Sequence, residues 1–141
     1  MAMESLIFNS FWEDLARGNI DLDTDTFKAM VVTDAYTPDK DAHTKRSDVT
    51  NEASGTGYTA GGQAVTVTVT KDTANDRLDV DISDPSWANA TLSGRGIVVY
   101  KSRGGAASAD ELVCSIAAGS DIVSTNGTWS FDVTSPLRVQ N

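Results

Sequence analysis

The sequence has little cysteine, histidine or proline, and no long apolar run. Cys114 is the only cysteine in 141 residues, so no disulfide can form within one chain. His43 is the only histidine, which excludes a zinc site built on two histidines of one chain. No stretch approaches the roughly 18 apolar residues of a membrane-spanning helix. The N-terminal MAMESLIFNSFWEDLA lacks the basic start of a secretory signal, so we expect no such signal.

Positive charge is also scarce. The chain has 20 acidic and 11 basic residues, and its formal net charge is -9 at pH 7. Nucleic acid is bound through Lys and Arg side chains that neutralise phosphates, so an acidic chain is repelled by it. The same balance argues against an anionic membrane surface. We therefore expect neutral or basic protein partners, no nucleic acid and no membrane.

The glycine-rich stretch ASGTGYTAGGQ, residues 53–63, raises the question of a phosphate site. A phosphate-binding loop needs glycines at defined spacing, in one class followed by Lys, and a helix that begins directly after the loop. Here no Lys follows, and the next segment, AVTVTVT, has the alternation of a strand. The pattern indicates a surface loop in which glycines adopt positive φ, with the ring of Tyr58 packed as its anchor.

Other candidate sites are weak. Asp21, Asp23 and Asp25 have the spacing of the first EF-hand ligands, but Thr26 stands where that loop requires glycine. His43 lies in a charged loop, and no G-x-S-x-G motif accompanies it, which favours a hydrogen-bonding role over catalysis. A buried, apolar position is expected for Cys114. We expect no catalytic, cofactor or metal residues.

Most of the chain has strand character. Strands are predicted at about 26–33, 64–70, 77–83, 87–92, 96–102, 111–117 and 128–133, with turns at SGRG, SRGGAAS and STNG. Residues 64–70 and 77–83 alternate strictly and form the clearest hairpin. The expected core positions are Val65, Val67, Val69, Leu78, Val80, Ile82, Trp129, Phe131 and Val133. Many short strands in a chain of this length predict one all-β domain, residues 1–141, built as a sandwich or small barrel.

One short helix is predicted in NSFWEDLARGN. Ser10 and Glu13 have capping-box spacing, and Gly18 is placed to end the helix. A long loop of about residues 34–62 separates the first two predicted strands. Loops of that length in a compact domain are usually functional.

Four segments together resemble a known group. They are FNSFWEDLARGNIDLDTDTFKAMVVTDAYTPDKDAHTKRSDVTNE, GTGYTAGGQAVT, DTANDRLDVDISDPSWANATLSGRGIVVYKS and the ending TSPLRVQN. They resemble the small structural proteins of tailed bacteriophages, in particular the capsid cement (decoration) proteins. The resemblance implies a jelly-roll-like β-sandwich on the outer capsid surface of the virion, made in the bacterial host cytoplasm. It also implies two partners, the major capsid protein and a second copy in a homodimer.

Candidate interface residues follow from charge and apolar exposure. Lys40, Lys45 and Arg46 form a basic cluster in the long loop that either meets carboxylates of a neighbouring subunit or is balanced locally by Asp39, Asp41 and Asp48. The aromatic residues of the N-terminal segment either close one end of the sandwich or lie at an interface. The full interface set is Lys40, His43, Lys45, Arg46, Tyr58, Phe8, Phe11 and Trp12.

Two other functions remain open. The first is a tail-associated structural protein of the virion, in the tube, tip or fibre. The second is an enzyme, either a carbohydrate-active β-sandwich or a virion-associated hydrolase, which would need paired carboxylates in a groove and for which Trp12, Trp87 and Trp129 would be the aromatic platforms. Trp12 and Trp129 lie on apolar faces of their predicted elements, which favours packing over ligand stacking.

Overall fold

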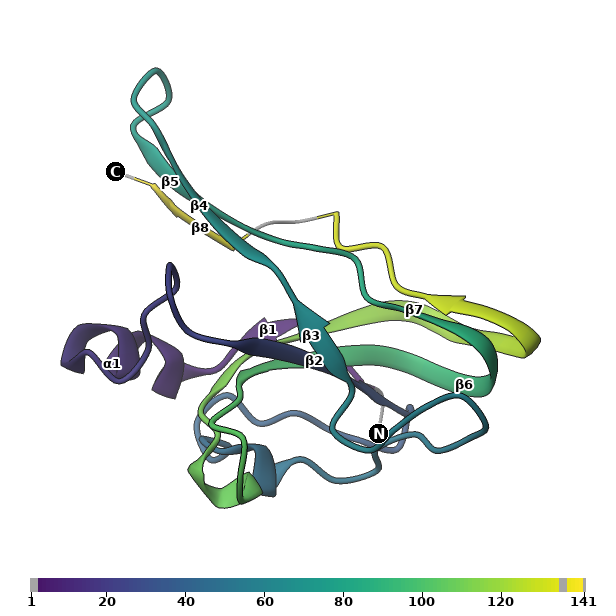
Figure 1. The fold of residues 1–141 in the computed structure, drawn as a ribbon. Coiled ribbons are helices and arrows are strands. Elements are labelled where there is room, and N and C mark those ends of the chain that lie inside the picture. The colour runs from purple at the N-terminus through teal and green to yellow at the C-terminus, as the bar shows by residue number, and fades with distance from the viewer. Residues whose placement is uncertain (1–2, 135–136, 141) are drawn as a thin grey trace.

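The fold is two antiparallel sheets of unequal size with one short helix. The computed structural model describes residues 3–134 and 137–140. A five-stranded sheet has the order β1-β7-β6-β2-β3, and a three-stranded sheet has the order β4-β5-β8. The expected all-β sandwich with a short N-terminal helix is confirmed. Figure 1 shows the smaller sheet rising as an arm from the body formed by the larger one.

The strands of the body are β1 (Leu6–Ile7), β2 (Phe27–Val32), β3 (Gln63–Val65), β6 (Ser86–Lys101) and β7 (Leu112–Ser130). Those of the arm are β4 (Val67–Asp72), β5 (Arg77–Ile82) and β8 (Leu137–Gln140). Two short 3₁₀ helices, η1 (Arg46–Asp48) and η2 (Ala107–Ala109), lie in loops of the body. The predicted strand at 64–70 is divided at Thr66, so that its first part pairs with β2 and its second part with β5.

The two longest strands were predicted as four. β6 continues through SGRG and β7 continues through STNG, which we expected to be turns. The glycines serve close packing instead, because a Cβ on Gly94 would collide with Val31 and a Cβ on Gly96 with the backbone of Ile116. Asn126 takes up a positive φ of 48° at an irregular point of the β6–β7 pairing.

The core lies on both faces of the five-stranded sheet. Phe27, Ala29 and Val31 of β2 face one cluster, while Met30 and Val32 face the other. Burial on both faces explains the continuous apolar runs of β2 and β6. The first cluster is covered by α1 (Asn9–Arg17) and the base of the arm, and the second by the N-terminal segment and the loop 33–62.

The expected core positions are confirmed in part. Val80, Ile82, Trp129 and Phe131 are buried, Val65, Val67, Leu78 and Val133 are half-buried, and Val69 is exposed. The exposed and half-buried valines and leucine lie mostly in the arm. Their alternation was interpreted correctly, but the sheet that carries them extends beyond the body, so nothing in the described chain covers its outer part.

The helix begins differently from the prediction. Phe8, not Ser10, occupies the N-cap position, no side chain caps the helix, and the buried hydroxyl of Ser10 has no partner among the described residues. The expected capping box is therefore wrong. The start of the helix is fixed instead by two backbone hydrogen bonds. The Phe8 N–H donates to Val113 O at 3.2 Å, and the Asn9 N–H donates to Lys40 O at 3.0 Å. Gly18 ends the helix with φ 77°, as predicted.

Candidate interaction surfaces

The glycine-rich loop is held to the body by hydrogen bonds within the chain. The Tyr58 hydroxyl donates to Glu52 Oε2 at 2.6 Å and accepts the Val31 N–H at 3.0 Å, and the Gly61 N–H donates to the same Glu52 oxygen at 2.7 Å. The Tyr58 ring packs on Trp87, with 5.3 Å between ring centroids. Burial, and then the bond to Glu52, raise the pKa of Tyr58. The expected anchoring is confirmed, and the half-buried Tyr58 has little surface left for a partner.

The basic cluster finds carboxylates within the chain. Arg46 Nε lies 2.8 Å from Asp110 Oδ2, and the guanidinium lies over the Tyr100 ring at 5.1 Å from its centroid. Lys45 Nζ lies 3.7 Å from Glu111 Oε2, while Lys40 forms an exposed pair with Asp41. We expected the carboxylates to come from a neighbouring subunit or from the loop itself. For Lys45 and Arg46, the segment between η2 and β7 supplies them instead.

Glu111 joins this cluster to a second arginine. Arg103 binds the Glu111 carboxylate with two bonds, Nε to Oε1 at 2.9 Å and Nη2 to Oε2 at 2.7 Å. Burial alone would raise the pKa of Glu111, but Arg103 and Lys45 outweigh it and hold the pKa below its usual value. A carboxylate that is 3% exposed and paired in this way joins the 44–48 loop to the 102–111 segment. The carboxylates of this network are buried, while the Lys45 and Arg103 side chains are 36% and 43% exposed.

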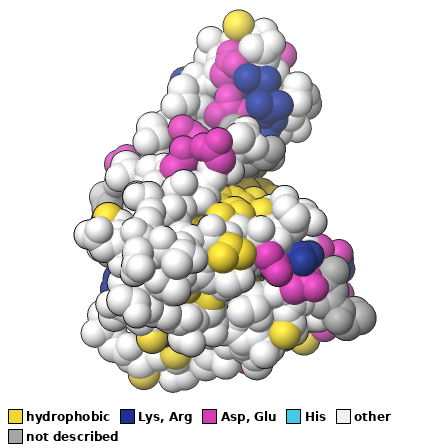
Figure 2. Space-filling view, turned by 90° about the vertical axis from the view of Figure 1, so that its right-hand side faces the viewer, with side chains coloured by type: hydrophobic (Ala, Val, Ile, Leu, Met, Phe, Trp, Pro, Cys, Tyr) yellow, Lys and Arg dark blue, Asp and Glu magenta, His cyan; other side chains and the backbone are white. Residues whose placement is uncertain are grey.

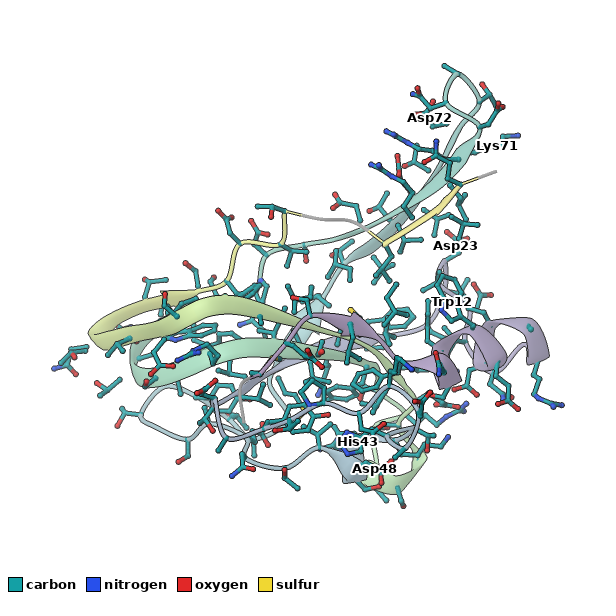
Figure 3. All side chains as sticks on the ribbon, turned by 180° about the vertical axis from the view of Figure 1, so that it is seen from behind. Trp12, Asp23, His43, Asp48, Lys71 and Asp72 are labelled. Carbon is teal, nitrogen blue, oxygen red and sulfur yellow. The ribbon has the colours of Figure 1, made fainter. Side chains whose placement is uncertain are left out.

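His43 is a hydrogen-bonding residue of the loop. Its Nδ1 lies 2.9 Å from the Tyr36 hydroxyl and accepts the Asp39 N–H at 3.2 Å. The ring stacks on Tyr36, with 5.7 Å between centroids. Figure 3 shows His43 beside Asp48 on the side of the body away from the arm. The half-buried His43 is therefore held by its own loop and by Tyr36.

The N-terminal aromatic residues separate into two kinds. Phe8 and Phe11 are 0% and 1% exposed and belong to the two core clusters, so their expected interface role is corrected: they close the body. Trp12 is 41% exposed, and its ring lies tilted against Phe11, with 5.2 Å between centroids. Figure 3 places Trp12 on the helix, on the side facing the arm, near Asp23. Of the three, only Trp12 is free to contact a partner.

The arm carries a bare apolar face. Cross-strand register places Val67 opposite Ile82, Val69 opposite Val80, and Leu78 opposite Val139, so these side chains share one face. The other face carries threonines and charged residues, including Asp79, Asp81 and Arg138. The apolar face is buried at its base but bare toward the tip, where Val69 is 38% and Val139 50% exposed. Lys71 and Asp72 mark the tip in Figure 3. Sequence reasoning found the alternation and assigned it to the core.

Two hollows lie beneath the arm. The first is a groove of about 540 Å³ between the arm base and the β1–β7 edge of the body. It is lined by Ser5, Leu6, Ile7, Ile82, Cys114, Ser115, Ile116, Ala117, Ala118, Ile122, Phe131, Asp132, Thr134 and Leu137. The second, about 550 Å³, lies between Val69 and the α1 side of the body, including Leu15 and Leu22. Figure 2 shows hydrophobic side chains gathered where the arm meets the body.

The carboxylates of Asp21 and Asp25, which precede β2, bind groups of the protein itself. Asp25 pairs with Lys101 at 2.9 Å and accepts the Asp21 N–H at 2.7 Å, and Asp21 accepts the Asp23 N–H. Within residues 3–134 and 137–140, no group of three metal-ligating side chains comes together. In the same ranges, no helix is long and apolar enough to cross a membrane.

Comparisons with protein-family models, with curated proteins and with solved structures found no match to this chain. Its function is therefore argued from its own residues and geometry. Features of the described residues that remain available to a partner include the bare arm face, Trp12, the groove and the exposed Val123 of β7. Sequence reasoning named Trp12, but neither the arm nor the groove, because both depend on how far one sheet extends past the other.

Proposed function

We propose that the chain is a non-enzymatic structural protein of a tailed-phage virion. It acts as a cement (decoration) protein on the outer face of the capsid, where it bridges neighbouring major capsid proteins. The observation that carries the proposal is the arm, a three-stranded sheet that rises from the body (Figure 1) and whose apolar face is partly bare, with Val69 38% and Val139 50% exposed. Exposed apolar patches on otherwise polar proteins mark protein interaction sites.

The charge and the sequence resemblance support the same role. A chain with net charge -9 suits the outer surface of a shell, because a protein lining packaged DNA would be repelled by it. Buried polar side chains of the described residues bind one another, as in the Arg46–Asp110 ion pair and the Tyr58–Glu52 hydrogen bond. These polar networks hold the loops of the body in place. A homodimer would present two arms to the shell.

The mechanism is thermodynamic linkage. A protein that binds the assembled shell and not its free subunits stabilises the assembled state by mass action. Each contact need supply only a modest free energy, because many copies act on one particle. In this scheme the body anchors the arm, and the partly bare apolar face of the arm, with Val69 and Val139, supplies the contact with the shell.

The test removes the protein from particles and heats them. We expect stripped particles to release DNA at a lower temperature, and re-addition of the protein to restore the original value. A Val139→Asp variant should restore less than wild type, because it places a charge on the bare face, while Gln140→Asp, on the opposite face of β8, should restore fully. An unchanged rupture temperature after stripping contradicts the cement role. A few copies found only on tails would favour the tail-associated alternative.

A further inference from the structure

The outer edge of β7 is largely unpaired. β7 lies between β6 and β1, but β1 pairs only with Ser115 and Cys114. From Ala118 to Ser130 no described strand lies on the outer side. Irregularities near Gly119 and Asn126 divide this edge, and the β6 register is continuous over Ile122–Ser124 between them. An unpaired edge presents backbone N–H and C=O groups on which another strand can form.

This edge is protected at its bulges and by the charged Asp121, which pairs with Arg95 at 2.9 Å, but not at Val123. Natural edge strands carry Lys, Pro or inward-pointing charges that discourage pairing. The stretch AGSDIVSTNGTWS, residues 118–130, contains no Lys, Arg or Pro. Val123 in its middle is 66% exposed, the most exposed large hydrophobic side chain among the described residues. The bulges bend the edge, but they leave its central part, near Val123, open.

The apolar groove lies directly beside this edge. Ile116, Ala118 and Ile122 of β7 line it from the body, and Ile82 and Leu137 line it from the arm. Side chains of a strand alternate between its two faces, so a strand paired to β7 would place every second side chain in the groove. The remaining side chains would face solvent beside Val123. The groove and the edge are therefore two parts of one surface.

The charge around the groove is negative. Asp132 lines it, and no Lys or Arg does. Glu4 adjoins Ser5 of the lining, and Asp84 accepts the Val133 N–H at 2.7 Å beside Asp132. Across residues 3–134 and 137–140, none of these three carboxylates takes part in an ion pair. A segment that enters the groove is therefore favoured if it carries positive charge.

We propose that the groove and the β7 edge near Val123 bind an extended segment of a partner protein by strand addition. The segment carries aliphatic side chains at alternate positions and a Lys or Arg that reaches Asp132. Main-chain bonds to β7 supply affinity, and the groove and its carboxylates select the side chains. This surface does not depend on the virion role, since it is defined by groove, edge and charge alone.

The test uses a synthetic probe with the free protein. The probe is a fluorescent peptide of alternating valine and threonine with a lysine at each end. We expect saturable binding by fluorescence anisotropy and slower amide exchange across Ile122–Thr125. A peptide with glutamate ends, and one N-methylated at alternate residues to block strand pairing, should each bind at least about tenfold more weakly. No saturable binding of the lysine peptide up to millimolar concentration overturns the proposal.

Two matched variants locate the binding. Val123→Lys and Val139→Lys make the same charge change at exposed valines, one on the β7 edge and one on the arm. Val123→Lys should weaken binding of the lysine peptide at least about tenfold, whereas Val139→Lys should leave its affinity unchanged. Equal affinities for the two variants overturn the proposal. The proposal is also overturned if the wild-type protein sediments as a dimer that Val123→Lys, and not Val139→Lys, dissociates. A second copy of the chain would then occupy the β7 edge.

Discussion

Arg46 and Asp110 form an ion pair that is buried on its acidic side. Arg46 Nε lies 2.8 Å from Asp110 Oδ2, and the Asp110 side chain is 1% exposed. Asp110 also accepts the Arg103 N–H at 2.8 Å, so its two oxygens tie the long loop to the end of the β6–β7 connection. The two residues stand 64 positions apart in the chain. Their pairing explains why a loop with little regular structure is held in one place.

Removal of the arginine should destabilise the protein strongly. Arg46→Ala leaves a buried carboxylate without its cation, for which a loss of about 3–5 kcal/mol in the free energy of unfolding is typical. Lys40→Ala, which removes an exposed pair with Asp41, should cost at most about 1 kcal/mol. Urea unfolding of both variants measures the difference. Equal unfolding free energies for the two would show that the Arg46 pair contributes no more than a surface pair.

Gly62 should not tolerate a side chain. Its φ is 78°, and an added Cβ would collide with the backbone oxygen of Ala29. Gly104 has a similar φ of 80°, but nothing lies within 4 Å of its added Cβ. Gly62→Ala should therefore lose about 2–4 kcal/mol, from backbone strain and overpacking together, and Gly104→Ala only about 1 kcal/mol. Thermal unfolding of the pair decides the matter, and similar melting temperatures would contradict it.

Asp48 should contribute to loss of stability in acid. Hydrogen bonds from the Thr44 and Lys45 N–H groups hold the pKa of Asp48 below its usual value near 4. A lowered folded-state pKa means that the contribution is fully present above the unfolded pKa and is lost as pH falls through the folded one.

In Asp48→Asn, the decline of the unfolding free energy below about pH 4 should be shallower than in wild type. Asp81→Asn is the control, because the exposed Asp81 carboxylate accepts no hydrogen bond among the described residues. Urea unfolding at a series of pH values gives the slopes. A slope in Asp48→Asn equal to that of Asp81→Asn would exclude the contribution.

Cys114 should be inert in the folded protein. Its side chain lines the groove but is 1% exposed, and burial raises the pKa of the thiol to about 12. Because the thiolate is the reactive species, a disulfide reagent at pH 8 should label Cys114 only as fast as the protein opens. Labelling rates with and without urea measure this. Rapid labelling of the native protein would mean that the groove opens readily to solvent.

Local patterns in the sequence predicted much of the fold. Strict alternation on either side of KDTAND correctly predicted the β4–β5 hairpin, and Gly18 ends the helix as expected. Both features depend on only a few neighbouring residues. The apolar position of Cys114 and the anchoring by Tyr58 also followed from local character. The breaks in β6 and β7 were wrong, since glycine serves a turn and a close contact equally well, and only the position of Val31 shows which applies at Gly94.

By itself, the sequence determined an acidic, all-β chain with one short helix and a long loop between the first two major strands. The tertiary structure decided which apolar side chains are covered. Val69 and Val80 are opposite partners in one hairpin, yet Val80 is buried and Val69 is exposed, because Val80 lies on the central strand of the arm, flanked also by Leu137, and Val69 lies on an edge strand. It also decided that Arg46 and Lys45 meet Asp110 and Glu111. Such pairings join segments distant in the chain, and local alternation and charge carry no information about them.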